Sequence, residues 1–463
     1  MLKRILIANR GEIALRILRA CRELEIETVV PYSQADADSL PVQMAGQAVC
    51  IGPAQSAESY LNQDALLTVA KATGCQGIHP GYGFLSENPE FADACAREGL
   101  VFIGPSGDTI RMAGSKSAAR ERMQAAGVPV TPGSDGPVRS PKQALKAAEQ
   151  VVYPVLLKAS AGGGGRGIRR CDRPEDLPSA FAAAQAEAES CFGNGELYLE
   201  KLLLQPRHIE FQILADRFGH VIHLGGRDCS IQRRNQKLLE EAPPPGLSAA
   251  LSQAMGEAAV RAAQAVHYEN AGTVEFLLDP ETEQFYFMEM NTRIQVEHGI
   301  TELVTGVDLV RQQLRIASGL PLEMTQEDLQ LQGHAIECRI NAEDPSQGFR
   351  PCPGTVSFVH FPGGPGVRVD SSLYSGETLS PYYDSMAAKL MVHAPNRLAA
   401  IRKLRRCLEE FLLEGVPTNV ELAHEILYHP SFIRGVCSTH FLDENLPQLL
   451  EFDRQLREGG PTT

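Results

Sequence analysis

Two hydrophobic periods alternate along the first part of the chain. Short apolar runs bounded by turn residues have the character of β-strands, at residues 3–8, 27–30, 47–51, 75–80 and 100–104. The segment after the first run carries Ile13, Ile17, Ala20 and Leu24 at helical spacing. This alternation of strand and helix predicts an open parallel α/β sheet. A dehydrogenase is disfavoured, because residues 9–16 hold one glycine where a G-x-G-x-x-G fingerprint needs three.

Beyond this region the pattern predicts α+β units. A single helix is expected over residues 108–127, and the turn-rich residues 128–141 mark a boundary. Residues 150–203 have the pattern of a compact unit of strand, glycine loop, helix and strand. Further strands are expected at 209–216, 220–228, 272–279 and 284–291, with a helix at 249–266 and a mixed α+β part after residue 333. We therefore expect a multidomain protein that is α/β at its N-terminus and α+β beyond it.

Length, charge and cysteine usage narrow the class of protein. A chain of 463 residues is too long for one core and suggests several domains. The net charge of −14 argues against a dedicated nucleic-acid binder. The chain shows no signal peptide and no apolar run of the roughly 18 to 20 residues that a membrane span needs. Eleven cysteines without a CxxC pair fit reduced thiols, so we expect a cytoplasmic protein without nucleic-acid or membrane partners.

The run FYFMEMNTRIQVEH, residues 285–298, begins as an apolar strand and ends as a dense polar segment. Strict strand alternation predicts one face with Phe285, Phe287, Glu289 and Asn291, and the other with Tyr286, Met288 and Met290. A carboxylate and an amide at a strand end are costly to bury without a partner, and a metal-bound phosphate would be a natural one. An anion clamp, an amide and two possible proton carriers follow: Arg293, Gln295, Glu297 and His298. The alternative is a surface loop with ordinary salt bridges.

A glycine run, Gly162 to Gly165, follows an apolar strand that ends in Lys158. Glycines let the backbone approach phosphate oxygens, and a lysine at this position could reach α- and β-phosphates. The run is not a Walker A loop, because no Gly-Lys-Ser/Thr follows. A flexible tight turn is the alternative interpretation. Lys116 could reach the same ligand from another direction, although a lone lysine on a helix is usually solvated.

Two carboxylates, Glu275 and Glu289, emerge from neighbouring apolar strands. With Asn291 they would supply the protein oxygens of a Mg²⁺ site, unless Glu275 instead pairs with a core arginine. A cationic stretch between these regions holds Arg233, Arg234 and Lys237, and it favours anion binding over a solvated face.

The loop HPGYGFLSEN, residues 79–88, follows a predicted parallel strand. The carboxyl ends of such strands are where open α/β sheets bind ligands. A structured loop without a ligand is the other interpretation.

Several of these segments together resemble one known family. IANRGEIALRI, HPGYGFLSEN, GGGGRG, RDCSIQRRNQK and EMNTRIQVEH occur in this order in the biotin carboxylases, which are members of the ATP-grasp superfamily. The resemblance covers about residues 2–445. The chain looks like the biotin carboxylase subunit of bacterial-type acetyl-CoA carboxylases. It implies a Rossmann-like domain at 1–115, an ATP-grasp domain at 116–320 with a mobile lid at about 131–203, and a C-terminal domain at 333–446.

The resemblance also implies a reaction. ATP and bicarbonate would give carboxyphosphate, whose CO₂ passes to biotin on a carrier protein, in the first half-reaction leading to malonyl-CoA for fatty acid synthesis. ATP contacts would come from Lys116, Lys158, Gly162, Gly163, Gly164, Gly165, Glu200, Lys201, Leu202, Leu203, His208, Gln232, Asn235, Lys237, Glu275 and Glu289. Mg²⁺ or Mn²⁺ would be held by Glu275, Glu289 and Asn291. Bicarbonate would be held by Lys237, Arg293, Gln295 and the Val296 backbone, with Glu297 as base, Arg339 stabilising the biotin enolate, and Tyr82 near biotin.

Partners follow from the resemblance as well. No Ala-Met-Lys-Met attachment motif is present, so biotin is expected on a separate biotin carboxyl carrier protein, with carboxyltransferase subunits completing the enzyme. Arg19 and Glu23 match one side of the family's homodimer contact, whereas Pro365 stands where relatives often carry phenylalanine. The same subunit of another acyl-CoA or pyruvate carboxylase remains an alternative. A non-catalytic nucleotide-binding regulator is disfavoured by the intact set of charged residues, and a carboxylate–amine ligase is disfavoured by RIQVEH and Arg339.

Overall fold

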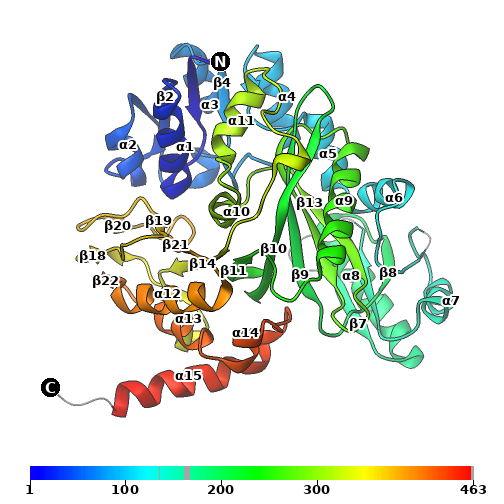
Figure 1. The fold of residues 1–463 in the computed structure, drawn as a ribbon. Helices are drawn as coiled ribbons and strands as arrows, with labels where there is room; N and C mark the ends of the chain where they lie inside the picture. The colour runs from blue at the N-terminus through cyan, green and yellow to red at the C-terminus, as the bar shows by residue number, and fades with distance from the viewer. Residues whose placement is uncertain (135, 161–166, 460–463) are drawn as a thin grey trace.

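The computed structural model describes residues 1–134, 136–160 and 167–459. At the N-terminus, five parallel strands form a sheet in the order β3-β2-β1-β4-β5 (Figure 1). Helices connect successive strands along the chain, as the alternation predicted. The elements are β1 (Arg4–Ile7), α1 (Gly11–Glu23), β2 (Glu27–Ser33), α2 (Leu40–Met44), β3 (Gln47–Gly52), α3 (Gln63–Ala72), β4 (Gly77–His79), α4 (Pro89–Arg97) and β5 (Val101–Phe102).

Neighbouring strand ends in this N-terminal sheet fix the loop that carries Tyr82. β1 and β4 lie side by side, and the side chain of Asn9 donates to the carbonyls of Pro80 and Tyr82, both at 2.7 Å. The loop after β4 is thereby fastened to the loop after β1. These are the carboxyl ends of two parallel strands, the position at which such sheets present ligand-binding loops.

The central sheet has eight strands in the order β13-β12-β9-β10-β11-β14-β21-β19, and its neighbours are antiparallel. Its strands are β9 (Arg207–Ala215), β10 (Val221–Arg233), β11 (Gln236–Ala242), β12 (Asn270–Leu278), β13 (Phe285–Asn291), β14 (His334–Asn341), β19 (Val367–Asp370) and β21 (Met386–Ala394). Helices α9 (Ala249–Ala265), α10 (His298–Thr305), α11 (Leu309–Ala317) and α12 (Arg397–Glu410) pack on it. Strands that are far apart in sequence thus share one hydrogen-bonded surface.

A separate three-stranded sheet, β7-β6-β8, forms the predicted lid. Its elements are α7 (Pro141–Val151), β6 (Val155–Ala159), β7 (Ile168–Cys171), α8 (Leu177–Phe192) and β8 (Leu197–Lys201). They enclose a small hydrophobic core of their own and lie on the opposite side of the molecule from β2 and α2 (Figure 1). The predicted phosphate loop, Gly162 to Gly165, lies outside the described residues.

The C-terminal region completes the fold with short two-stranded sheets and helices. These are β15 (Glu343–Asp344), β16 (Arg350–Pro351), β17 (Gly354–Thr355), β18 (Phe358–His360), β20 (Thr378–Leu379), β22 (Leu412–Glu414), α13 (Val420–Ile426), α14 (Pro430–Arg434) and α15 (Phe441–Gly459). The largest hydrophobic cluster lies here, under α12 and α13. Among the described residues, helices that combine the length and the apolar character needed to cross a bilayer are not found.

The prediction of a single helix over residues 108–127 is wrong. Two helices, α5 (Gly107–Gly114) and α6 (Lys116–Ala125), are separated at Ser115, whose backbone is extended at φ −88° and ψ 104°. The glycine and serine at the junction are poor helix formers, which explains the break. As a result Lys116 begins a new helix at the boundary with the central sheet.

The prediction that side chains alternate strictly between the two faces of β13 is also wrong. The ladder pairs Glu275 with Glu289 but pairs the next residue of β12 with Phe287, so Met288 is an extra, bulged residue. Phe287 and Met290 both pack in the core under α9, although alternation placed them on opposite faces. The bulge re-aims the polar end of the strand. Glu289 therefore shares the face of Glu275 rather than that of Phe287.

Candidate active site

The centre of the site is the ammonium group of Lys237, near the start of β11. Its Nζ lies 2.6 Å from Glu210 on β9, 3.0 Å from Glu275 on β12 and 2.7 Å from Glu297 in the turn before α10. These carboxylates come from three separate segments and are almost completely buried. A buried charge is tolerated only when it is paired, and here one cation serves three anions.

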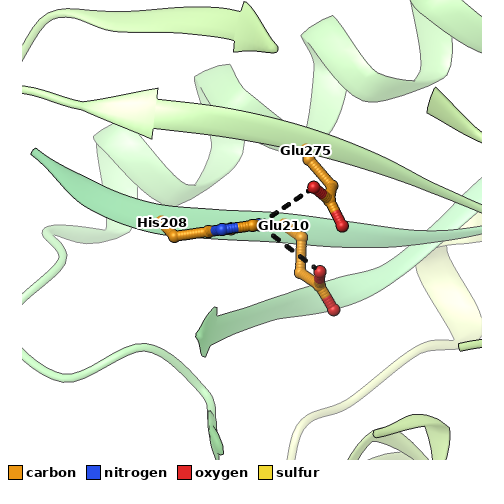
Figure 2. Close-up of side chains that lie close together, drawn as sticks. All are labelled: His208, Glu210 and Glu275. Atoms are coloured by element: carbon orange, nitrogen blue, oxygen red, sulfur yellow. Dashed lines mark ion pairs between the residues drawn. The ribbon is translucent and has the colours of Figure 1, made fainter. Parts of the chain in front are cut away.

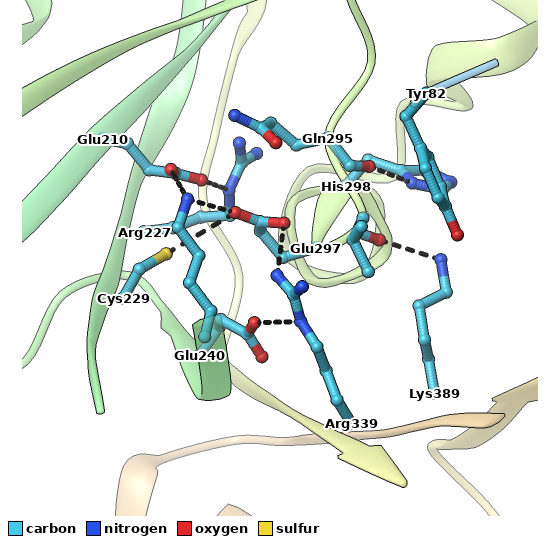
Figure 3. A network of polar contacts seen from close by, with 12 residues as sticks. Tyr82, Glu210, Arg227, Cys229, Glu240, Gln295, Glu297, His298, Arg339 and Lys389 are labelled. Atoms are coloured by element: carbon cyan, nitrogen blue, oxygen red, sulfur yellow. Dashed lines mark hydrogen bonds and ion pairs between the residues drawn. The ribbon is translucent and has the colours of Figure 1, made fainter. Parts of the chain in front are cut away.

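Two arginines extend this cluster into a row of alternating charges (Figure 3). The fully buried Arg227 donates to Glu210 at 2.6 Å. On the other side, Arg339 of β14 donates to Glu297 at 2.9 Å and to Glu240 of β11 at 2.6 Å. Each oxygen of Glu297 therefore faces a different cation, one from Lys237 and one from Arg339.

The row of charges shifts the protonation of its members. Burial alone would raise the pKa of Glu297, but Lys237, Arg339 and Arg227 outweigh it and hold that pKa well below its usual range. Burial raises the pKa of Glu240 to about 7 despite the arginine beside it. Burial would lower the pKa of Lys237, yet the surrounding carboxylates raise it well above its ordinary value. At neutral pH the lysine is charged and Glu297 is ionised.

A set of oxygen ligands gathers around Glu275. Asn291 donates to Glu275 at 2.9 Å and Gln295 does so at 3.2 Å. Glu289 lies opposite Glu275 across the ladder, and burial together with repulsion from Glu275 raises its pKa. Two carboxylates that oppose each other, with an amide alongside, fit a hard divalent cation such as Mg²⁺. Pairing of Glu275 with a core arginine is not found among the described residues; its cationic partners are Lys237 and His208.

His208, on β9, lies beside the carboxylates of Glu210 and Glu275 (Figure 2). Its Nε2 lies 3.2 Å from Glu275 and 3.7 Å from Glu210. Burial lowers the pKa of His208, but the attraction of Glu275 and Glu210 and the hydrogen bond to Glu275 together outweigh it, so the net shift of the pKa is upward. His208, Glu210 and Glu275 thus bring three potential metal ligands close together, beside the ammonium group of Lys237.

Arg293 is oriented by neighbours on both sides. Its guanidinium donates to the side-chain oxygens of Gln295 at 2.8 Å and Asn291 at 3.2 Å, and lies 3.1 Å from Glu87. Glu87 comes from the loop after β4, so the clamp spans the N-terminal and central sheets. The carbonyl of Val296 accepts from Lys389, a contact that the sequence did not suggest.

The lid contributes one ion pair near its strand ends. Lys158 of β6 and Glu200 of β8 lie 2.5 Å apart, and Arg120 approaches Glu200 at 3.5 Å. Lys201 points elsewhere, because its ammonium donates to backbone carbonyls of the lid. Leu202 continues the chain and donates from its backbone to Pro154, and Leu203 follows it, partly exposed.

The cationic stretch between β10 and β11 divides into two parts. The guanidinium of Arg233 lies over the ring of Phe349, and Arg234 is exposed on the turn, so only Lys237 enters the charge cluster. Gln232 is buried and pairs across the ladder with Lys237, whereas Asn235 is exposed with φ 66°.

Several members of the cluster were missed from the sequence. Glu210 and Arg227 lie on strands that the hydrophobic pattern did predict, and Glu240 and Lys389 lie within apolar runs. A signal was present at Glu210, because polar side chains alternate with isoleucine and phenylalanine along residues 209–213. A strand with that pattern inside a protein must pair its charges, which would have suggested a partner for Glu210.

A central antiparallel sheet, a small separate lid and a buried cluster of cations and carboxylates define a nucleotide-dependent ligase of the ATP-grasp type. Three family models match the chain: "Biotin carboxylase, N-terminal domain" at residues 1–110, "Carbamoyl-phosphate synthase L chain, ATP binding domain" at 115–325, and "Biotin carboxylase C-terminal domain" at 337–444. The chain belongs to the biotin carboxylase family.

Similar proteins agree over the whole length. A biotin carboxylase of Nostoc is 55% identical over 441 residues, covering 95% of this chain and 98% of the relative. A pyruvate carboxylase subunit of Methanothermobacter thermautotrophicus is 50% identical, covering 96% and 90%. Among solved structures, the biotin carboxylase domain dimer of 2-oxoglutarate carboxylase from Hydrogenobacter thermophilus, in complex with MgADP and bicarbonate, matches with TM-score 0.90 and 47% identity over 97% of this chain and 98% of that one.

Proposed function

We propose that this biotin carboxylase is the subunit of an acetyl-CoA carboxylase that uses ATP and bicarbonate to carboxylate biotin on a separate carrier protein. The observation that carries the chemistry is the Lys237 ammonium shared by three carboxylates, with Arg339 on the second oxygen of Glu297. We expect this arrangement to become active when incoming anions bind the cations and replace the carboxylates as their partners. Bicarbonate and nucleotide phosphates are anions of this kind.

Bicarbonate would lie between Arg293, Gln295, Lys237 and the backbone of Val296, next to Glu297. When the anion engages Lys237, that cation attracts Glu297 less strongly, and the pKa of Glu297 rises toward its ordinary range. Glu297 then accepts the bicarbonate proton, a step typically worth about 10²- to 10⁴-fold. The resulting carbonate is held for attack on the γ-phosphoryl group of ATP.

Nucleotide phosphates would be contacted by Lys158 from the lid and by Lys116 from the start of α6. His208, Glu275, Glu289 and Asn291 face the same region, and the last three would hold Mg²⁺ or Mn²⁺. When bound, this ion would neutralise charge that develops on the phosphates. The lid, residues 131–203, would close over ATP and exclude water. Adenine would lie along the strand end made by residues 200–203.

Biotin would approach from the other side of Glu297. Arg339 is only 15% exposed and already directed at Glu297, which suits it to stabilise the enolate form of the ureido ring. Tyr82, on the loop after β4, would lie near the ring. We also propose the domain limits 1–115, 116–320 and 333–446, close to the ranges that the family models match.

The proposal includes partners and location. The related 2-oxoglutarate carboxylase domain is a dimer, and here Arg19 and Glu23 are exposed on α1 while Pro365 is exposed just before β19. These surfaces support a homodimer. A biotin carboxyl carrier protein and carboxyltransferase subunits would complete the enzyme. The described cysteines are all free thiols, most of them buried, which supports a cytoplasmic location.

The decisive experiment measures ATP cleavage by the purified protein with and without bicarbonate and free biotin. We expect cleavage to depend on bicarbonate and to rise with biotin. Cleavage that is absent, or insensitive to both, would refute the carboxylase chemistry.

A second candidate is the same subunit of a pyruvate or 2-oxoglutarate carboxylase, favoured by the identity to relatives of those kinds. The half-reaction is the same, so the acceptor must be tested separately. Reconstitution with the carrier and transferase proteins of the source cell, with acetyl-CoA, pyruvate and 2-oxoglutarate offered in turn, separates the candidates.

A further inference from the structure

Lys389 is a fully buried cation to which the proposed chemistry assigns no role. It lies on β21 directly opposite Arg339 of β14, so both side chains project from the same face of the central sheet. Its Nζ donates to the carbonyl of Val296 at 2.8 Å and lies 3.1 Å from Glu12 and 3.8 Å from Asp370.

These contacts join three parts of the molecule at one atom. Val296 belongs to the turn that presents Glu297. Glu12 lies in the first turn of α1, the helix that follows β1 of the N-terminal sheet. The same oxygen of Glu12 accepts a hydrogen bond from the hydroxyl of Tyr82, and Figure 3 shows Tyr82 and Lys389 on the same side of Glu297. The lysine therefore connects the loop of Tyr82 to the turn of Glu297.

Several buried acids surround Lys389 and keep it charged. The second oxygen of Glu12 and both oxygens of the neighbouring Glu337 are buried without a hydrogen-bond partner among the described residues. Burial would lower the pKa of Lys389, but Glu12, Glu337 and Asp370 raise it, so the ammonium keeps its charge. Moving this ammonium group would leave the buried Glu12 without its cationic partner, whereas Asp370 would keep Arg368.

We infer that Lys389 is a positioning residue that sets the distance between the bicarbonate turn at Val296 and Glu297 and the biotin loop at Tyr82. This role rests on the proposed function, because it assumes that the two substrates meet there. A displacement of about 1 Å in a reacting pair can cost about 100-fold in rate. Lys389 touches neither substrate and acts only through the groups that it holds.

The test compares Lys389→Met with the double variant Glu12→Gln/Lys389→Met, which removes the buried charge pair as a unit. Arg397→Met is the matched control: Arg397 also pairs with a buried glutamate, Glu241, but lies on α12, away from the turn. For each variant, thermal unfolding, MgATP affinity, bicarbonate KM, kcat with free biotin, and ATP cleaved per carboxybiotin formed are measured.

We expect kcat to fall about 100-fold in both Lys389 variants. The bicarbonate KM and the ATP cleaved per carboxybiotin should rise, while MgATP affinity stays within about twofold. The double variant should regain thermal stability without regaining turnover, and Arg397→Met should lose stability alone.

Two results would overturn the role. One is turnover and coupling within about twofold of the unaltered protein in a folded Lys389 variant. The other is a double variant that recovers turnover together with stability, since that would make the lysine purely structural. Failure of the unaltered protein to cleave ATP with bicarbonate would instead refute the proposed function, so the two failures are distinguishable.

Discussion

The centre of the central sheet and the lid sheet handle charge in opposite ways. At the centre, Lys237, Arg227 and Arg339 alternate with carboxylates from several strands, and every pair is largely buried. In the lid, alanines and leucines make up most of the core, and the charged pair near the strand ends, Lys158 and Glu200, is 24% and 12% exposed. Chemistry that depends on fixed distances is thus built into one hydrogen-bonded sheet. The contacts that we propose to a nucleotide, which must enter and leave, lie on a unit with its own core.

The largest effect should come from Glu297→Gln, which alters the centre without changing its shape. We expect bicarbonate-dependent turnover to fall by about 10²- to 10⁴-fold, because the amide cannot accept the bicarbonate proton. MgATP affinity should stay nearly unchanged, since the nucleotide ligands are other residues. Steady-state ATP cleavage and nucleotide titration measure the two quantities, and normal turnover would remove Glu297 from the role of base.

Arg227→Met tests whether the centre depends on complete pairing. The change leaves the fully buried Glu210 with Lys237 at 2.6 Å and the more distant His208 at 3.7 Å. Breaking a buried pair typically costs about 3–5 kcal/mol of folding free energy. Denaturant unfolding measures the loss, and Arg227→Met/Glu210→Gln should recover part of it. A loss below about 1 kcal/mol would place this pair with ordinary surface bridges.

Lys158→Met makes the corresponding change in the lid, with the opposite balance of effects. Stability should fall by less than in Arg227→Met, because the Lys158 side chain is 24% exposed and Arg120 still lies 3.5 Å from Glu200. The KM for ATP should rise about tenfold or more, as expected for a lost charge-assisted contact to phosphate. Lys201→Met is the control within the lid, since Lys201 donates to lid carbonyls instead. Equal KM changes in both variants would contradict the assignment of Lys158.

The smallest effect concerns pH and a buried group outside both regions. Burial lowers the pKa of His79 to about 3, and its Nδ1 accepts from the backbone of Gly81 at 3.1 Å. The unfolded chain therefore binds a proton that the folded chain does not, so stability falls as the pH drops below about 6.5.

At pH 5.5 this difference amounts to about 1.4 kcal/mol. His79→Asn, whose amide oxygen can still accept from Gly81, should lose less stability between pH 7.5 and pH 5.5. Thermal unfolding at both values measures the difference, and identical pH responses would contradict the assignment.

Much of the fold could be predicted because periodicity reports local environment. The strands of the N-terminal sheet, the lid hairpin and the positions of β9, β10, β12 and β13 along the chain follow from short apolar runs. The bulge at Met288 could not be predicted, since it depends on how β13 pairs with β12. The break at Ser115 had a local signal in the Gly114-Ser115 pair, which the apolar periodicity alone did not reveal. Motif-bearing residues such as Lys237 and Glu297 could be identified. Glu210 and Lys389 lie inside apolar strands, and their importance emerges only when the sheet brings their partners together.

The pairing of β11 with β14 has a consequence for any attempt to divide the protein. Leu239 to Ala242 form a continuous ladder with the first half of β14, so the family boundary near residue 325 cuts between two bonded strands. A fragment ending there would expose β11 as an open edge with unsatisfied amides and carbonyls. Such edges recruit other chains. We therefore expect an isolated ATP-binding fragment to self-associate, and the two halves to unfold together as one cooperative body.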